Sequence, residues 1–309
     1  MSKLALVMLA ACQLDEPATG TVEQHGMNMQ GMNMQGASLA GIDLANVRVE
    51  KGELVADENG DTLRGTALVG AHFYAQVASA ADPSVTAQVE YRITAIEPES
   101  ASYDPTHTGS TYLYTLEQYV TDTGTWATAC GADLDGRHVA IPLTATWNAH
   151  GDRVESSTLF TFACTTGVIA KCYRWGYRPW LTGYGNIVDY HETCTRLARA
   201  DYCGNGIPHT HDGTWVNVWD LMPPPGPIQT HGLLTPVGMV FEAGWNTQGA
   251  VCVSRARWLL DDTLANLCPD HLIPPGLLGA TVCDTVSEAL GYDGGALMFD
   301  ESYLNLITD

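Results

Sequence analysis

The chain has 309 residues, a length typical of about two domains and sufficient for a substantial core. It carries 14 lysine and arginine residues against 35 aspartate and glutamate residues, a formal net charge of −21. Nucleic acids and anionic lipid headgroups are bound by clustered basic side chains, so this composition argues against a general attraction to either, and we expect no nucleic-acid partner. The acidity instead favours solubility and repulsion between copies of the chain.

The number of cysteines indicates the compartment in which the protein folds. Cys12 stands apart near the N-terminus, and eight further cysteines follow. An even set of this size in an acidic, exported-looking chain predicts disulfides that form outside the cytosol, although the sequence leaves their pairing open. No Cys-x-x-Cys motif is present, which weakens the case for a redox-active dithiol or a zinc ribbon. The eight disulfide candidates are Cys130, Cys164, Cys172, Cys194, Cys203, Cys252, Cys268 and Cys283.

Residues 1–11 have the features of a bacterial export signal. One basic residue, Lys3, precedes a short apolar run, and Leu9-Ala10-Ala11-Cys12 resembles a lipobox, where a lipoprotein signal is cut and the new N-terminal cysteine is acylated. We therefore predict a signal peptide over 1–11, lipidation of Cys12, a polar tether over 12–25, and a lipid anchor in the cell envelope, at the outer membrane or cell surface. The alternative is an ordinary secretory signal with Cys12 incidental, which predicts a secreted protein.

An internal repeat occupies residues 26–75. It opens with a perfect duplication of Gly-Met-Asn-Met-Gln over 26–35, and apolar residues then continue to recur every five positions. Neither a helix nor a plain strand has this period, and the pattern resembles pentapeptide repeats, which wind as a square β-helix with the central apolar residue inside. The rival interpretation is a low-complexity linker followed by ordinary strands. The recurring residues are Met29, Met34, Leu39, Leu44, Val49, Leu54, Leu63, Leu68 and Phe73.

Residues 76–165 are predicted to form a β domain. Several short segments are rich in alternating, β-branched or aromatic residues, and His150-Gly151-Asp152 is a good hairpin turn between two of them. Short strands separated by turns predict a small barrel or sandwich. Cys130 and Cys164 are placed to form a disulfide at the end of this domain. The predicted strands are 87–96, 111–121, 138–147 and 154–164.

Residues 166–309 are predicted to form a disulfide-rich α+β domain, organised around 172–220. That stretch holds three of the nine cysteines and four of the eight tryptophans. In a small disulfide-rich domain, large aromatic side chains are expected in the core rather than in a ligand groove, because each buries a large apolar area. The aromatic residues concerned are Trp175, Tyr177, Trp180, Trp215 and Trp219. Other predicted elements are a helix over 168–177, strands over 237–243 and 250–258, and a short helix over 284–290.

A second helix is predicted from His191 to Ala200. Cys194, Leu197 and Ala198 lie at i, i+3 and i+4 and make an apolar face, from which Arg196 and Arg199 point away. We expect this helix to end near residues 201–203, because Gly204-Asn205-Gly206 tolerates the positive φ of a C-terminal cap.

Three blocks of sequence occur in order: KCYRWGYRPW, then Ala200-Asp201-Tyr202-Cys203, then HTHDGTWVNVWD. In these blocks and their order the chain resembles the ADYC domain, a bacterial envelope domain, over about residues 158–220 and through the rest of the C-terminal half. The resemblance implies an envelope address and a disulfide-stapled architecture. It implies no reaction, because no activity is established for that family.

The best candidate for chemistry is His209-Thr210-His211-Asp212. Histidines at i and i+2 lie on one side of a strand, and the carboxylate could complete a zinc or calcium site, but nothing in the sequence fixes further ligands. A solvated turn explains the same residues. Asp57-Glu58-Asn59-Gly60-Asp61 resembles half a calcium loop, but its glycine is misplaced, and we interpret it as a turn. No cofactor is expected.

The sequence thus predicts an α+β, mostly β fold. A short pentad-repeat β segment is followed by a small β barrel or sandwich and a disulfide-rich α+β C-terminal domain. We expect an exported or lipid-anchored envelope protein with a structural or ligand-binding role, whose partners are the membrane and an envelope protein or glycan. One alternative is an envelope hydrolase or metal-dependent enzyme built on His209, His211 and Asp212. A calcium-dependent adhesin is a third.

Overall fold

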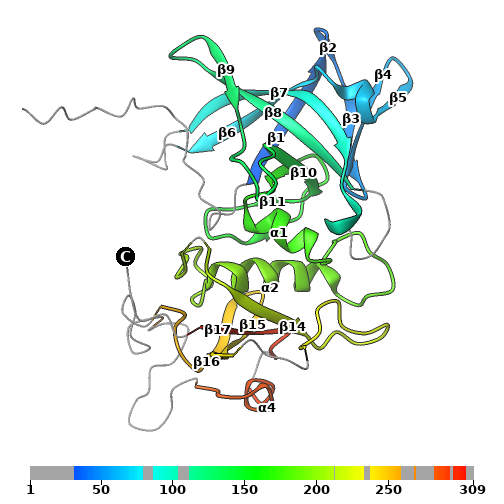
Figure 1. Ribbon diagram of the computed structural model, residues 1–309. Coiled ribbons are helices and arrows are strands. Elements are labelled where there is room, and N and C mark those ends of the chain that lie inside the picture. The colour runs from blue at the N-terminus through cyan, green and yellow to red at the C-terminus, as the bar shows by residue number, and fades with distance from the viewer. Residues whose placement is uncertain are drawn as a thin grey trace, which may run out of the picture.

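The computed structural model describes residues 31–78, 86–103, 111–211, 213–232, 237–258, 268, 282–292 and 295–303. The predicted signal peptide, Cys12, the tether and Asp212 lie outside these ranges. The fold is mostly β with few helices, which confirms the predicted class. Helices α1 (Val168–Arg174) and α2 (Ile187–Arg199) lie between two sheets, and α4 (Val286–Ala289) lies beyond the second sheet (Figure 1).

The larger sheet is strongly curved. Its strands follow the order β10-β13-β1-β6-β7-β8-β9, with β2 beside β1, and β10 also pairs with β8 at Val139 and Ala140. The small barrel or sandwich predicted for 76–165 is therefore one curved sheet, and it includes β1 from upstream. Its strands are β1 (Gly31–Leu39), β2 (Ile42–Asp43), β6 (His72–Ala78), β7 (Thr86–Pro98), β8 (Tyr112–Val120), β9 (Thr125–Thr128), β10 (Val139–Thr144) and β13 (Phe160–Cys164).

Smaller elements flank this sheet. A three-stranded antiparallel sheet joins β3, β4 and β5, and β11 and β12 form a short hairpin around the predicted 150–152 turn. The bounds are β3 (Ala45–Glu50), β4 (Glu53–Glu58), β5 (Asp61–Arg64), β11 (Thr146–Trp147) and β12 (Arg153–Val154), with 3-10 turns η1 (Gly65–Leu68) and η2 (Ala101–Tyr103).

The predicted pentapeptide coil is wrong for the described part of the repeat segment. Residues 31–75 form antiparallel strands, not stacked coils. The physical reason is the turns: Lys51-Gly52 and Asn59-Gly60 adopt positive φ and reverse the chain between neighbouring strands, as two-residue hairpin loops do. The half calcium loop at Asp57–Asp61 is therefore a hairpin turn, as the sequence indicated, with Glu58 paired with Asp61.

The five-residue recurrence nevertheless identifies residues that share one core. This core lies against the curved sheet, with Phe73, Phe160 and Phe162 in edge-to-face ring contacts. Met34, Leu44, Leu54, Leu68 and Phe73 are buried in it, and Leu39, Val49 and Leu63 pack against it.

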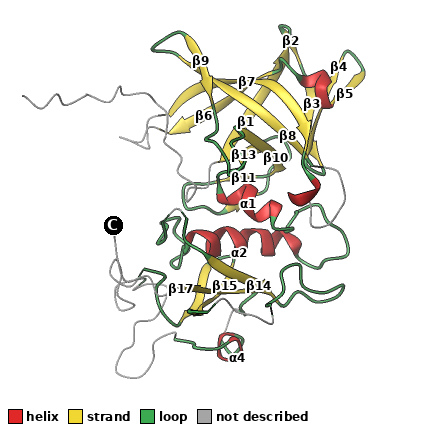
Figure 2. Cartoon of the chain, viewed as in Figure 1, coloured by secondary structure: helices red, strands yellow, loops and turns green. Residues whose placement is uncertain are grey.

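The C-terminal half builds a second sheet on α2. The four antiparallel strands have the order β14-β17-β15-β16. Leu197 of α2 packs with Ala243 and Trp245 of this sheet, while Ile169 of α1 packs with Ile141 on the outer face of the curved sheet. Helix α2 lies next to the second sheet, and α1 lies next to the curved sheet (Figure 2). The strands are β14 (Val216–Asp220), β15 (Met239–Asn246), β16 (Gly249–Val253) and β17 (Met298–Tyr303).

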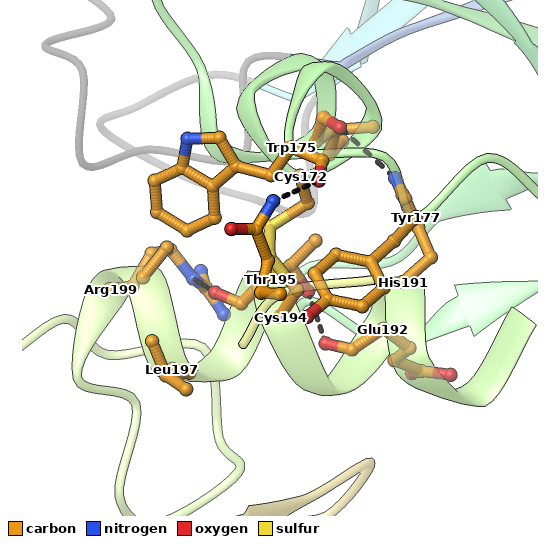
Figure 3. The surroundings of a disulfide bond; sticks show 12 residues. Cys172, Trp175, Tyr177, His191, Glu192, Cys194, Thr195, Leu197 and Arg199 are labelled. Carbon is orange, nitrogen blue, oxygen red and sulfur yellow. Dashed lines mark hydrogen bonds between the residues drawn. A yellow bond between two sulfur atoms is a disulfide. The ribbon is translucent and has the colours of Figure 1, made fainter. Parts of the chain in front are cut away.

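Four disulfides cross-link the chain, and one of them joins the two central helices through Cys172 and Cys194 (Figure 3). Such a set of disulfides indicates an oxidising, extracellular compartment. Within the described ranges, no helix combines the length and apolarity that crossing a bilayer requires. The pairs are Cys130–Cys164, Cys172–Cys194, Cys203–Cys268 and Cys252–Cys283.

Gly204 is a position where the packing demands glycine. A Cβ there would overlap the carbonyl oxygen of Gln248, because the 203–206 loop crosses the β15–β16 turn backbone to backbone. We expect Gly204→Ala to cost about 1–3 kcal/mol of overpacking in addition to the strain of its positive φ. The matched control is Gly183→Ala, also at positive φ but with open space around it, which should cost about 1 kcal/mol. Urea unfolding with disulfides intact measures both, and equal losses would contradict the steric account.

Candidate functional site

The four-residue motif at 200–203 begins where α2 ends. The helix stops at Arg199, and Ala200 adopts a left-handed conformation with φ 52°. The backbone N–H of Asp201 then donates to the carbonyl of Arg196 at 2.9 Å. The sequence placed the end two to four residues later and assigned the positive φ to the Gly204–Gly206 loop. The earlier turn brings the Asp201 side chain back against its own helix.

The Asp201 carboxylate is bound by two arginines of α2. Its Oδ2 lies 2.7 Å from Nη1 of Arg196 and 2.7 Å from Nη2 of Arg199, and its oxygens also accept the backbone N–H groups of Asn205 and Gly206. Asp201 and Arg196 are fully buried, and Arg199 is nearly so. A buried carboxylate is costly unless its charge is paired and its oxygens are hydrogen-bonded, and both conditions are met here.

Arg196 extends these contacts to a turn on each side of α2. It pairs with Asp152 and donates through Nη1 to the His150 carbonyl at 2.6 Å, both in the β11–β12 turn beside the curved sheet. Its Nε donates to the carbonyl of Thr247, in the β15–β16 turn of the second sheet, at 3.2 Å. One guanidinium therefore joins α2 to segments on either side of it. We call this group the Asp201 cluster; it comprises Asp152, Arg196, Arg199 and Asp201.

Tyr202 enters a second buried group, on the C-terminal sheet. Its hydroxyl donates to Oε1 of Glu242 at 2.8 Å and accepts the backbone N–H of Arg257 at 2.8 Å. The Arg257 guanidinium lies 3.0 Å from Oε2 of Glu242 and 2.9 Å from Oδ2 of Asp300. Trp245 Nε1 donates to the other Asp300 oxygen at 2.7 Å. We call this group the Arg257 cluster; it comprises Tyr202, Glu242, Trp245, Arg257 and Asp300.

The charges of the Arg257 cluster are coupled. Burial opposes ionisation of Glu242, but the charge of Arg257 and several hydrogen bonds lower the pKa of Glu242 below its ordinary value. Burial, together with repulsion from Glu242, raises the pKa of Asp300 well above its ordinary value. Burial and the Glu242 charge also raise the pKa of Tyr202, so its hydroxyl stays neutral and donates. The cluster thus contains an ionised Glu242–Arg257 pair, and Asp300 is the carboxyl that takes up a proton first.

Arg257 also completes the C-terminal end of α2. The last carbonyls of an α-helix have no partner within the helix and carry a partial negative charge. Nη2 of Arg257 donates to the Leu197 carbonyl at 2.9 Å, and Nη1 lies 3.3 Å from the Ala198 carbonyl. The guanidinium of a residue distant in sequence therefore hydrogen-bonds the last free carbonyls of this helix.

Every residue of the motif consequently has a structural partner. Ala200 forms the turn, Asp201 holds two arginines, Tyr202 binds Glu242, and Cys203 forms a disulfide with Cys268. The charged groups of both clusters point at one another and, apart from Asp152, are buried from solvent. This arrangement joins separate segments of the chain to the end of α2.

Two of the predicted metal-site residues, His209 and His211, lie beside these clusters. His209 packs against the Tyr202 ring, and its backbone N–H donates to the Arg199 carbonyl. His211 contacts the Trp258 ring edge-on, with ring centres 4.4 Å apart. Asp212 is outside the described residues, within which no three metal-ligating side chains cluster. Zinc or calcium binding at His209, His211 and Asp212 stays a prediction.

The aromatic residues expected in the core divide into two groups. Tyr177 and Trp219 are buried, as predicted, and Trp175 and Trp180 are partly buried. Trp215 is 75% exposed, so its assignment to the core is wrong. It lies one residue before β14, an edge strand that pairs with a single neighbouring strand.

Comparison with protein families identifies the domain in which these clusters lie. The family model of the ADYC domain matches residues 65–259, which is more than half of the chain. The chain belongs to the ADYC domain family. No curated protein and no solved structure matches it.

The ADYC match covers most of the curved sheet as well as the central helices. It starts at residue 65, at the 3-10 turn η1 before β6, and ends at 259, whereas the sequence resemblance covers about 158–220 and the rest of the C-terminal half. The Asp201 cluster lies wholly within the match. Asp300 of the Arg257 cluster lies beyond it, on β17, so residues outside the ADYC match complete the packing of Tyr202.

The buried arginines were missed by the sequence analysis. Arg196 and Arg199 were placed on the side of the helix away from the apolar face, yet both are buried. A compositional signal was present: the 14 basic residues include only three lysines, Lys3, Lys51 and Lys171. Arginine suits buried ion pairs better than lysine, because its planar guanidinium binds carboxylates through several N–H groups and is more weakly hydrated.

Asp201→Asn tests the Asp201 cluster. The change leaves two buried guanidinium groups short of a carboxylate, so we expect the free energy of unfolding to fall by about 3–5 kcal/mol. The control is Asp135→Asn, which removes a carboxylate with a 49% exposed side chain paired with Arg137 and should cost less than about 1 kcal/mol. Denaturant unfolding under non-reducing conditions measures both. A small loss for Asp201→Asn would show that the cluster does not stabilise the fold.

His191 gives the fold a sensitivity to acid. It is fully buried on α2, beside the Cys172–Cys194 disulfide, and Nε2 contacts the Ile169 carbonyl at 3.0 Å (Figure 3). Burial lowers the pKa of His191 to about 4 from an ordinary value of 6.5. Between these values the unfolded state binds more protons than the folded state, so stability falls as pH falls from about 6.5 to about 4.

His191→Gln should make this fall shallower. Glutamine can still donate to the Ile169 carbonyl but takes up no proton, which removes up to about 1.4 kcal/mol per pH unit from the slope of stability against pH. Urea unfolding between pH 7 and pH 4 measures the slope. His150→Gln, at an exposed histidine, is the control and should keep the parent's slope. An unchanged slope in His191→Gln would contradict this assignment.

Proposed function

We propose that the chain is an exported cell-envelope protein, held in the membrane by lipid on Cys12, with a structural or binding role and no catalytic activity. The observation that carries the proposal is the set of buried contacts made by the motif at residues 200–203. The polar groups of Asp201 and Tyr202 are bound to buried arginines and to Glu242, so the motif maintains the fold. A substrate would have no access to them without unfolding the end of α2.

The disulfides support the exported part of the proposal. Eight cysteines form four pairs, which leaves Cys12 as the one cysteine in the chain outside the paired set. Its position directly after Leu9-Ala10-Ala11 is that of an acylated residue rather than a structural one. Several acyl chains anchor a protein stably, because each buried CH₂ contributes about 0.8 kcal/mol.

Metabolic labelling tests the anchor. In cells given an alkyne fatty acid, the full chain should incorporate label and sediment with membranes, and its intact mass should show cleavage before Cys12 plus a lipid increment. Cys12→Ser should abolish the label and release the protein into the soluble fraction. Thr21→Ser, a conservative change in the predicted tether, is the control and should behave as the parent. Release of the unlabelled parent into the medium would replace the lipoprotein assignment with that of a secreted protein.

A further inference from the structure

A groove lies on the face of the C-terminal sheet opposite α2. Its volume is about 470 Å³, and it runs between the loop that follows β14 and the turn that precedes α4. The side of the sheet against α2 is filled by the Arg257 cluster and its apolar neighbours, whereas this side is only partly covered by α4 (Figure 1). The groove is lined by Trp219, Leu221, His231, Phe241, Val286 and Glu301, among others.

The walls of the groove are apolar and partly open. Leu221 is 51% exposed on one side, and Phe241 and Val286 are partly buried on the other. The base is made rigid by aromatic contacts: the Trp219 ring lies edge-on to the His231 ring at 4.4 Å between centres and stacks on Phe299 at 5.9 Å. A ligand would therefore meet a preformed apolar surface, which lowers the entropy lost on binding.

The polar groups of the groove are mainly carboxylates. Glu301 is held in place by its neighbours, with Oε2 2.9 Å from Nδ2 of Asn217 and Oε1 3.2 Å from Nε2 of His231. Asp284 lies on the exposed turn before α4 and accepts a hydrogen bond from Ser254 at 2.8 Å. No lysine or arginine is among the described residues that line the groove.

Two exposed aromatic residues lie at the same end of β14 and β17. Trp215, which is 75% exposed, is one residue before β14, and Tyr303 is the last residue of β17. Within the strands, side chains two apart share a face, so Asn217 lies with Trp219 on β14, and Glu301 lies with Tyr303 on β17. The groove therefore follows the strand direction, a shape that suits an extended chain.

We propose that this groove binds an extended segment of a partner protein that carries lysine or arginine side chains. The apolar stems of such residues would pack on Leu221 and Phe241, and their charged ends would reach Glu301 and Asp284. A chain with net charge −21 also attracts cationic partners over longer distances. The inference deepens the binding role in the proposed function and is independent of the lipid anchor.

A neutral glycan fits these observations less well. Sugar rings stack on exposed aromatic faces and need both donors and acceptors for their hydroxyls. In this groove Trp219 is buried, and the donors on Asn217 and His231 contact Glu301. The remaining acceptors are the carboxylates of Glu301, whose side chain is 14% exposed, and of the exposed Asp284, and their charge contributes most when the ligand is a cation.

Peptide titration tests the proposal on the full chain with disulfides intact. The probe is a fluorescein-labelled short peptide of alternating lysine and leucine, measured by fluorescence anisotropy. The same peptide with glutamate in place of lysine, and a labelled chito-oligosaccharide, are the comparison ligands. We expect the lysine peptide to bind, with an affinity that falls as salt rises, and the other two not to bind.

Two charge-matched double variants distinguish attraction by the groove carboxylates from attraction by the net charge of the whole chain. Glu301→Gln with Asp284→Asn removes two of the three carboxylates among the described residues that line the groove, the third being the buried Asp220, and should weaken the lysine peptide at least about tenfold. Asp43→Asn with Asp122→Asn changes the net charge equally at exposed sites elsewhere and should leave affinity within about twofold. Leu221→Ala, at an exposed wall residue, should weaken binding a few-fold without lowering the melting temperature.

Three results would overturn the inference. Equal weakening in both double variants would assign the attraction to net charge alone. Binding of the chito-oligosaccharide without the lysine peptide would assign the groove to glycans. Binding of the glutamate peptide would exclude charge recognition. None of these would affect acylation or export, so the proposed anchor and this groove can fail separately.

Discussion

The fold depends on the pairing of buried charges around the end of α2. Removing a carboxylate and a guanidinium from water costs several kcal/mol per group unless each hydrogen-bonding direction is filled. Asp201 meets this requirement through two arginines and two backbone N–H groups, and Arg257 meets it through Glu242, Asp300 and the carbonyls that end the helix. Such contacts have a narrow tolerance in distance and angle, so they fix how the segments that supply them lie relative to one another.

Several parts of the fold follow from sequence patterns. Alternation predicted the long strands of the curved sheet, and His150-Gly151-Asp152 predicted the turn of the β11–β12 hairpin, because both signals are local. The pentad period identified apolar residues that share a core but suggested the wrong backbone, since hairpin turns carry the chain back between neighbouring strands. Periodicity reports which side chains face inward; it does not report whether successive strands are parallel or antiparallel.

The clusters were harder to anticipate because their partners are far apart along the chain. Arg257 binds Glu242, Asp300 and the end of α2, and no spacing rule relates these positions. Helical periodicity placed Arg196 and Arg199 opposite the apolar face, which is correct on the helix but assumes that this side meets water. Here α2 is covered on both sides, by a sheet and by the β11–β12 turn, so its polar side is also an interior surface.

The order of the disulfides along the chain has a consequence for biogenesis. The first four paired cysteines join consecutively, Cys130 with Cys164 and Cys172 with Cys194, so each bond can close as soon as its second cysteine enters the oxidising compartment. The last four interleave, because Cys203 joins Cys268 and Cys252 joins Cys283. An oxidase that links cysteines in order of arrival would join Cys203 to Cys252. Maturation of the C-terminal sheet therefore requires either thiol–disulfide exchange by an isomerase or oxidation that is delayed until translocation is complete.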